Sequence, residues 1–291
     1  MKSKVTHALT IDLEDWFCST NMEKIVPYKI WDKQVLRIEN STKKILDILS
    51  KKKTLATFFV LGWVAEKIPH VITEISRKGH EISSHGFNHK RLFDLSLEDF
   101  EYDIKKSIDI IEDITSKPVV GYRAPSFSLI SNKEQIFEIL MKNNIIYDSS
   151  ILPSSYHPDY GYLPPSPTTP YWLKHGHLLE VPVTVTSLLG FNVPMGGGYF
   201  RLLPYFYTQY SLLKFNLKNQ STIFYFHPWE LDIHQPIMKI PYTKRFIHYY
   251  GLNKAEEKFN RLIDEFSFAP IKDVILPTFF QNNDKSHDKK H

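Results

Sequence analysis

Residues 55–89 read LATFFVLGWVAEKIPHVITEISRKGHEISSHGFNH and contain two strand patterns separated by a helix pattern. The continuous apolar run at 55–62 is typical of a strand that is buried on both faces. Residues 69–79 have a helical pattern that ends at a glycine, and residues 80–85 return to a strand pattern. This order predicts two parallel strands that are joined by a crossover helix.

The same alternation continues along most of the chain. Further strand patterns occupy residues 5–11, 119–125, 145–150, 177–185 and 221–230. Further helix patterns occupy residues 40–53, 96–114, 132–144, 201–215 and 253–268. Strands that alternate with helices predict a parallel sheet covered by helices. With 291 residues, of which 42% are hydrophobic, the chain fits a single-domain α/β fold of the (β/α) barrel type.

The expected domain limits follow from where this alternation stops. Six prolines between residues 153 and 176 predict an irregular loop over the mouth of the barrel. We expect one domain over residues 1–275, with a helical extension from about residue 235. The polar tail at 276–291 is expected to be disordered.

Composition excludes several classes of protein. The net charge of +4 comes without a basic stripe or a groove-reading motif, which argues against nucleic-acid binding. A single cysteine, Cys18, excludes an intrachain disulfide and a cysteine metal cluster. The apolar run near the N-terminus is too short for a signal peptide, and no run of about 18 apolar residues occurs, so we expect no membrane span and a cytoplasmic location. The aromatic share of 14% favours a cleft that uses rings to bind a sugar.

Polar side chains recur at the carboxyl ends of the predicted strands. They are Asp12, Glu14, Asp15, His85, His89, Arg123, Asp148 and His227. In a barrel of parallel strands these ends meet on one face, where active sites are built. The sequence therefore predicts that these side chains lie close together.

His85 and His89 are the candidate metal ligands. Two histidines four residues apart share one face if they lie on a helical turn, so both imidazoles can bind one ion. The alternative is a pair of surface or core-edge histidines. A site of two histidines and a carboxylate suits zinc or a similar divalent ion, and the acidic segment TIDLED at residues 10–15 can supply the carboxylate.

The acidic segment also offers a general base. Three carboxylates in four residues raise one another's pKa unless a cation lies between them. A metal would take one carboxylate and leave another as a base, with Arg123 as its partner. His227 precedes Pro228 at a strand end and is either an acid or a core-edge histidine.

Four further residues are weaker candidates. Asp148 either tunes the acid and base or caps a turn. A backbone N–H near Phe127 is a candidate donor to an oxyanion. Trp16 and Trp229 are either core residues or platforms for a sugar ring.

These motifs together resemble the polysaccharide deacetylases, the NodB-homology family of carbohydrate esterases. The resemblance extends from about residue 5 to residue 230 and includes TIDLED, HGFNH, RAPSF, YDSS and FHPW in the family's order. The segments GGGYFRLLP and FHPWE are similar to a subgroup encoded in bacterial exopolysaccharide and surface-glycan loci.

The resemblance implies a distorted (β/α) barrel and a metal-dependent hydrolase, most simply a zinc enzyme, that removes N-acetyl groups from N-acetylhexosamine units of a bacterial polysaccharide or its precursor. It implies that Asp12 is the catalytic base and that Arg123 tethers it. It also implies that His85 and His89 are metal ligands and that His227 is the catalytic acid.

The chain departs from the family pattern at two places. Leu13 separates the base from the next acid, so either Glu14 or Asp15 is the third ligand, with a slight preference for Glu14. Gly86 replaces the usual serine or threonine. Two rival functions stay open: hydrolysis of a small non-sugar amide, and glycan binding by a protein that has lost catalysis.

Overall fold

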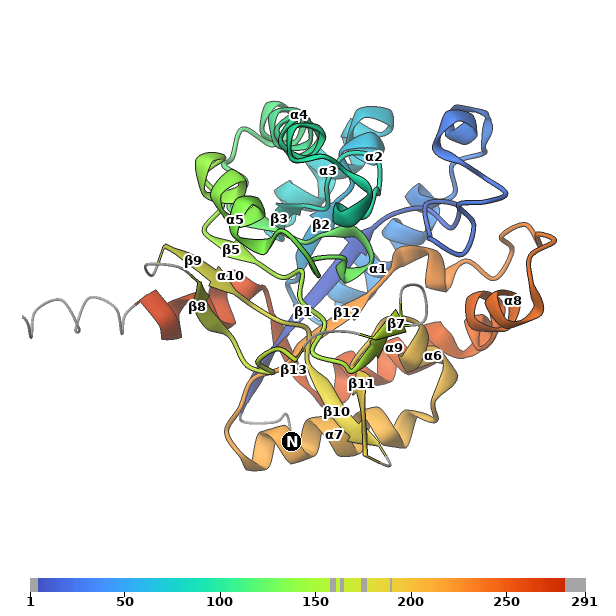
Figure 1. Ribbon diagram of the computed structural model, residues 1–291. Helices are drawn as coiled ribbons and strands as arrows, with labels where there is room; N and C mark the ends of the chain where they lie inside the picture. The colour runs from blue at the N-terminus through green and yellow to red at the C-terminus, as the bar shows by residue number, and fades with distance from the viewer. Residues whose placement is uncertain (1–4, 158–160, 163–164, 174–176, 189, 281–291) are drawn as a thin grey trace, which may run out of the picture.

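The computed structural model describes residues 5–157, 161–162, 165–173, 177–188 and 190–280. Its core is a curled sheet with the strand order β12-β1-β2-β3-β4-β5-β9-β8, and β13 pairs with β1 off this path (Figure 1). The strands are β1 (Thr6–Leu13), β2 (Thr57–Val60), β3 (Glu81–Ser84), β4 (Gly121–Tyr122), β5 (Tyr147–Asp148), β8 (Tyr171–Leu173), β9 (Leu178–Glu180), β12 (Ile223–Phe226) and β13 (Ser267–Ala269). All pairings are parallel except β8 with β9. The predicted α/β fold of the distorted (β/α) barrel type is confirmed, and its sheet curls into a half-barrel.

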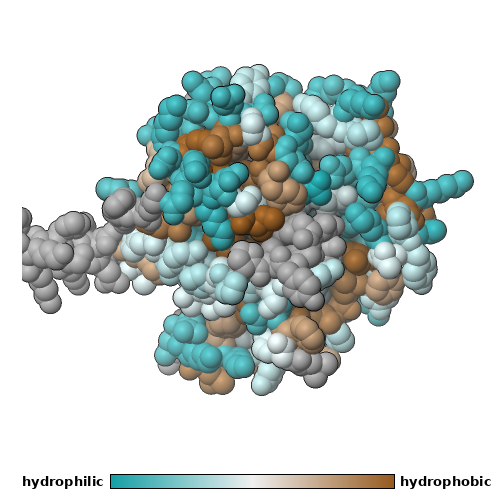
Figure 2. All heavy atoms as spheres, in the orientation of Figure 1, coloured by the Kyte–Doolittle hydropathy of each residue, from teal (hydrophilic) through white to brown (hydrophobic). Residues whose placement is uncertain are grey.

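Helices cover the outside of this sheet. They are α1 (Ile38–Lys51), α2 (Gly62–Lys67), α3 (Pro69–Arg77), α4 (Leu97–Thr115), α5 (Lys133–Lys142), α6 (Gly197–Leu202), α7 (Tyr205–Leu217), α8 (Tyr242–Tyr249), α9 (Leu252–Glu265) and α10 (Ile271–Val274). In Figure 1, α2 to α5 lie above the sheet and α7 lies below it. Figure 2 shows hydrophilic residues over much of this face and hydrophobic ones toward its centre.

Strand β1 is the central element of the sheet and is buried on both faces. Seven of its eight residues are buried. It pairs with β12 and β2 along its length and with β13 at its start. In this register Ile11 lies beside Phe226 and Asp12 lies beside Phe59. The carboxyl ends of β12, β1 and β2 therefore share one edge of the sheet.

A serine side chain caps the start of helix α4. Ser96 is the N-cap, and its Oγ accepts the N–H of Asp99 at 3.0 Å. The buried residues that follow at helical spacing include Phe100, Ile104 and Ile108. This stripe packs α4 against α2 and α3, which holds the layer above β3 in place.

Several segments differ from the sequence-based expectations. The loop predicted at 153–176 contains β8 and a short hairpin, β6 (Tyr156–His157) with β7 (Gly161–Tyr162). The strand predicted at 177–185 divides into β9 and β10 (Val185–Leu188), and β10 pairs with β11 (Phe191–Pro194). The helix predicted at 201–215 divides at Pro204, which ends α6 and is the N-cap of α7 because proline has no N–H to continue a helix.

The C-terminal region also differs from its prediction. The extension expected to be helical contains β13, which pairs with the start of β1. The tail expected to be disordered from residue 276 is helical at 276–280, and Leu276 is buried. The rest of that predicted tail, 281–291, lies outside the described residues. No helix in the described parts of the chain is long and apolar enough to cross a lipid bilayer.

Candidate active site

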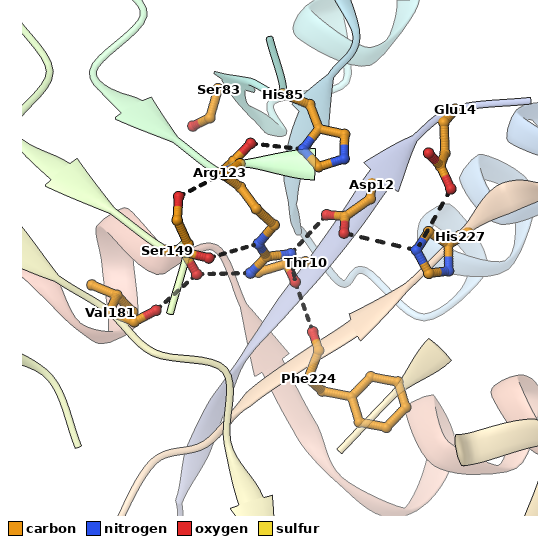
Figure 3. A network of polar contacts seen from close by, with 12 residues as sticks. Thr10, Asp12, Glu14, Ser83, His85, Arg123, Ser149, Val181, Phe224 and His227 are labelled. Atoms are coloured by element: carbon orange, nitrogen blue, oxygen red, sulfur yellow. Dashed lines mark hydrogen bonds and ion pairs between the residues drawn. The ribbon is translucent and has the colours of Figure 1, made fainter. Parts of the chain in front are cut away.

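Four strand ends bring the predicted polar residues into one pocket. Strand β1 supplies Asp12 and continues to Glu14, β3 is followed by His85, β4 by Arg123 and β12 by His227. Figure 3 shows Asp12, Glu14, His85, Arg123 and His227 facing one another across this edge of the sheet. All but Arg123 line the same cleft, together with His89, Phe127 and Trp229.

Glu14, His85 and His89 are placed to hold a metal ion. One possible ligand atom from each lies within 4.8 Å of the others. Glu14 Oε2 lies 2.7 Å from His89 Nε2, so both atoms are directed at the same point in the pocket. Two imidazoles and a carboxylate are a donor set that suits zinc, so the residues present fit a divalent cation.

The hydrogen bonds of His85 prepare it for this role. Its Nδ1 lies 2.8 Å from the carbonyl oxygen of Arg123, which only accepts, so Nδ1 carries the proton and Nε2 keeps its lone pair. Burial lowers the pKa of His85 to about 4, which keeps the imidazole neutral. A metal-binding histidine must be neutral, so both features favour a ligand.

The histidine pair lies on a loop, and the expectation of a helical turn is wrong. Residues 85–91 are not helical, and His89 has a φ of 56°. Gly86 has a φ of 72°, and a Cβ placed on it would lie 2.8 Å from Asp103 Oδ2. That same oxygen accepts the N–H of Phe87 at 2.8 Å. Asp103 thus shapes the loop and leaves no room for a serine or threonine at residue 86.

The structure distinguishes Glu14 from Asp15. The carboxylate of Asp15 accepts N–H groups from Trp16 at 2.8 Å, Arg37 at 2.7 Å and Ile38 at 2.9 Å, so it stabilises the start of α1. Glu14 points into the pocket. Although burial opposes its ionisation, His89, His227 and His85 hold the pKa of Glu14 well below its ordinary value. Glu14 is therefore the carboxylate beside the histidines.

Arg123 holds Asp12 as predicted. Its Nη1 donates to Asp12 Oδ1 at 2.7 Å and to Thr10 Oγ1 at 2.8 Å, and its Nη2 donates to Ser149 Oγ at 2.9 Å. The guanidinium is fully buried, over the ring of Phe59. These bonds fix one oxygen of Asp12 and leave Oδ2 directed toward His227 (Figure 3).

His227 faces both acids from the opposite side of the pocket. Its Nε2 lies 3.8 Å from Asp12 Oδ2 and 3.8 Å from Glu14 Oε1. Burial alone would lower its pKa, but the hydrogen bond and charge of Glu230, with Glu14 and Asp12, raise the pKa of His227 to about 9. The ring is therefore protonated at neutral pH, as an acid must be.

Two family profiles match this chain, one in each half. The profile described as Polysaccharide deacetylase matches residues 20–143, and a domain of unknown function, DUF3473, matches residues 149–276. The first half of the chain is therefore similar to polysaccharide deacetylases. The two matched regions share the pocket, because His85 and His89 lie in the first match and His227 lies in the second.

Curated relatives and a solved structure are consistent with this similarity. Over 119 residues the chain is 31% identical to a peptidoglycan deacetylase of Helicobacter pylori, covering 40% of this chain and 39% of the relative. Over 92 residues it is 32% identical to a peptidoglycan-N-acetylglucosamine deacetylase of Bacillus cereus, covering 32% and 34%. The chain thus spans well under half of either relative. A putative polysaccharide deacetylase structure from Mycobacterium smegmatis shares the fold with a TM-score of 0.62 at 18% identity, covering 94% of this chain and 90% of that one.

Asp148 and Trp16 were predicted for this site but do not line the cleft. Asp148 is fully buried behind the pocket, hydrogen-bonded to Ser150, and burial raises its pKa to about 6 beside Glu180. It does not line the cleft, and no hydrogen bond or ion pair joins it to Asp12 or His227 among the described residues, so its role in tuning the acid and base stays a prediction. Trp16 is a core residue that packs edge-on against Phe17, so it is no sugar platform.

Trp229 and Phe127 line the cleft, but their contacts differ from those expected from the sequence. Trp229 donates its indole N–H to Glu14 Oε1 at 3.0 Å, and its ring lies between His227 and His248. Trp229 is 5% exposed and stacks on both histidine rings, so little of its ring is available to a sugar. Phe127 lines the pocket, but its N–H donates to the carbonyl of Ala124 at 3.1 Å, so it is not available to an oxyanion.

Sequence reasoning missed Glu230 and Arg201 as residues of this site. Glu230 Oε2 lies 3.0 Å from His227 Nδ1, and Arg201 Nε donates to Glu230 Oε1 at 2.5 Å. The signal for Glu230 was its position three residues after His227, with a proline between, which is typical of the first turn of a helix. No local pattern signals Arg201, which is 29 residues away.

Proposed function

We propose that this protein hydrolyses N-acetyl groups from N-acetylhexosamine units of a bacterial polysaccharide or its precursor. One observation carries the proposal: Asp12 and His227 face each other across a pocket that also holds Glu14, His85 and His89. An acid and a base on either side of a possible metal site suit the hydrolysis of an amide. The names of the curated relatives support an N-acetylated glycan as the substrate.

Glu14, His85 and His89 would hold the metal, which we propose to be zinc. A divalent cation at this place lowers the pKa of water and polarises a carbonyl group. The protein's own part is to keep the ligands neutral or anionic and directed inward. The hydrogen bonds from His85 Nδ1 to the carbonyl oxygen of Arg123 and from Trp229 to Glu14 serve that purpose.

Asp12 would accept the proton of the attacking water. Its Oδ1 is bound to Arg123, so Oδ2 is the basic atom that faces the pocket. Arg123 fixes the direction of the carboxylate because four other contacts, to Thr10, to both oxygens of Ser149 and over Phe59, hold the guanidinium. A base that cannot turn away loses little entropy when the substrate binds.

His227 would give a proton to the departing nitrogen. An amine leaves poorly as an anion, so C–N cleavage needs an acid near the nitrogen. His227 Nε2 points into the cleft, and its side chain is 17% exposed, enough to meet a substrate. The product is a free amino sugar and acetate.

We further propose that residues 1–275 act as one catalytic unit. Strand β13, near the end of this range, pairs with β1, and His227 from the second half completes the cleft. The DUF3473 segment would therefore be part of the deacetylase and not a separate function. The alternative function is hydrolysis of a small non-sugar amide. Measuring hydrolysis of both kinds of substrate distinguishes the two functions.

Acetate release tests the proposal directly. Purified protein with zinc is incubated with N-acetylglucosamine oligomers, with peptidoglycan fragments and with small ureides, and acetate and free amine are measured. We expect equal amounts of acetate and amine from a glycan, and loss of both after chelation. Hydrolysis of the ureides alone would contradict the proposal.

Metal content tests the ligand set in the same preparations. Elemental mass spectrometry is expected to find about one zinc per chain, none in Glu14→Gln or His85→Ala, and the wild-type amount in Asp15→Asn. Retention of zinc by Glu14→Gln with loss in Asp15→Asn would reverse the assignment.

A further inference from the structure

Two sequence segments contain charged residues, Arg201 and Glu230, that take no part in the proposed proton transfers or in metal binding. The segments are GGGYFRLLP, residues 196–204, and FHPWE, residues 226–230. The structure joins them, because Arg201 of the first contacts Glu230 of the second. Both side chains are buried, Arg201 with 1% and Glu230 with none of its side-chain surface exposed. A buried ion pair next to the active site requires an explanation beyond stability, since such pairs contribute little to it on balance.

Glu230 uses both of its oxygens. Oε1 accepts from Arg201 Nε at 2.5 Å, and Oε2 lies 3.0 Å from His227 Nδ1 and accepts the backbone N–H of His227 at 3.0 Å. The imidazole is therefore held through Nδ1 and through its own main chain. Its Nε2 is left to face Asp12 and Glu14.

Arg201 is itself held in place. Its Nη1 donates to the carbonyl of Tyr250 at 2.5 Å and its Nη2 to the carbonyl of Ile247 at 3.0 Å, both at the end of helix α8. All three nitrogens of the guanidinium therefore donate hydrogen bonds. These bonds fix Arg201, so it cannot follow Glu230 if the carboxylate moves. The direction of the carboxylate, and so of the imidazole, is set by the fold.

The glycines bring Arg201 to this position. Gly196 has a φ of 135°, and a Cβ on it would lie 2.1 Å from the carbonyl oxygen of Tyr225. Gly197 has a φ of 48°, and its Cβ would lie 2.5 Å from the ring of Tyr225. Only glycine lets α6 begin against β12, two residues before His227. One turn later, α6 places Arg201 beside Glu230.

We propose that Glu230, anchored by Arg201, is the positioning residue of the catalytic acid His227. It binds Nδ1 and thereby fixes the proton to be transferred on Nε2, facing the leaving nitrogen. The inference rests on the proposed function. Asp148, which was expected to tune the acid, does not line the pocket.

The proton transfer balances without another reactant. When the C–N bond of the tetrahedral adduct breaks, its electron pair stays on nitrogen, and that nitrogen takes the proton from His227 Nε2. The imidazole becomes neutral and keeps the proton on Nδ1, shared with Glu230. Glu230 stays ionised throughout and contacts no substrate atom.

Substrates with different leaving groups test this role. In Glu230→Gln the amide can still fill the space but no longer offers a carboxylate to Nδ1. We expect kcat for acetate release from N-acetylglucosamine oligomers to fall about 100-fold, with KM within about twofold. Hydrolysis of 4-nitrophenyl acetate should stay within about threefold of wild type, because 4-nitrophenolate leaves without a proton.

Asp232→Asn is the matched control. Asp232 also forms an ion pair with an arginine, Arg37, on the same loop, but it does not touch His227. We expect both activities of Asp232→Asn to stay near wild type. Equal losses of amide and ester hydrolysis in Glu230→Gln at unchanged metal content would overturn the proposal, as would full retention of amide turnover.

Nitrogen NMR of the His227 ring tests the same point without turnover. In the wild-type zinc protein we expect Nδ1 to carry a hydrogen-bonded proton at neutral pH, assigned by comparison with His227→Asn. An unprotonated Nδ1 would overturn the inference even if Glu230→Gln failed to fold. If no glycan is deacetylated but the Nδ1 proton is present, the proposed function fails and the positioning contact stands.

Discussion

Trp229 donates its indole N–H to Glu14 Oε1 at 3.0 Å while its ring lies parallel to that of His248, 4.6 Å away at 4°. This contact connects residues 215 positions apart and links the second half of the chain to a candidate metal ligand in the first. The stacked ring leaves the indole little freedom. Glu14 is therefore oriented by a residue that itself cannot move.

Removal of this donor is expected to weaken metal binding. In Trp229→Phe the ring still stacks but Glu14 loses one hydrogen bond, and outer partners of metal ligands typically contribute about 10- to 100-fold to affinity. We expect the zinc dissociation constant, measured by competition with a chromophoric chelator, to rise about 10-fold. Trp16→Phe is the control, because the indole N–H of Trp16 has no partner among the described residues. An equal rise of the zinc dissociation constant in the two variants would show that the hydrogen bond from Trp229 to Glu14 does not strengthen zinc binding.

Loss of the general base should separate turnover from metal content. Asp12→Asn keeps the shape of the side chain and its bond from Arg123 but cannot accept a proton. We expect kcat to fall by about 100- to 10,000-fold while the protein keeps about one zinc per chain. Acetate release and elemental analysis on one preparation check both quantities. A variant with full activity would show that another group is the base.

The glycine of the histidine loop gives a prediction about stability. Gly86→Ala puts a Cβ 2.8 Å from Asp103 Oδ2 at a φ of 72°. Gly190→Ala meets no atom within 4 Å at a similar φ of 84° and so measures the backbone cost alone, about 1–2 kcal/mol.

We expect urea unfolding of the zinc-free protein to show a larger loss in Gly86→Ala than in Gly190→Ala. Zinc affinity should fall only in Gly86→Ala, because His85 and His89 lie on either side of the displaced segment. Identical free energies of unfolding in the two variants would show that the loop accommodates the Cβ without moving Asp103.

Acid sensitivity is expected from His80, at the start of β3. Burial, with Lys78 nearby, lowers the pKa of His80 to about 4, and its Nδ1 accepts the N–H of Ala56 at 3.2 Å. The unfolded chain takes up this proton below about pH 6.5, whereas the folded protein does so only near pH 4. The free energy of unfolding therefore falls as the pH drops through this window.

Between pH 7.5 and pH 5, protonation of His80 in the unfolded chain lowers the free energy of unfolding by about 2 kcal/mol. This contribution is measured as the difference between wild type and His80→Gln in urea unfolding at the two pH values, which cancels the other titrating groups. We expect the wild type to lose more stability than the variant on acidification. Parallel losses would show that the ring is protonated in the folded state.

Local patterns were sufficient to predict most of the sheet and to place four polar residues at strand ends. The apolar run of β2, the capped helix α4 and the strand ends at Asp12, His85, Arg123 and His227 are all readable from spacing, because hydrophobic periodicity is a property of consecutive residues. His89 was expected on a helical turn and lies on a loop in a left-handed conformation. That loop is held by Asp103, which accepts the N–H of Phe87 and lies on another element.

The amino-acid sequence by itself determined that parallel strands would carry two acids, two histidines, an arginine and a late histidine to one edge. Only the tertiary structure decided which acid joins the histidines, because Asp15 is taken by the N–H groups of Arg37 and Ile38. It also decided that Glu230 and not Asp148 holds His227. Hydrogen bonds between residues distant along the chain set both choices, and such contacts leave no periodic trace in the sequence.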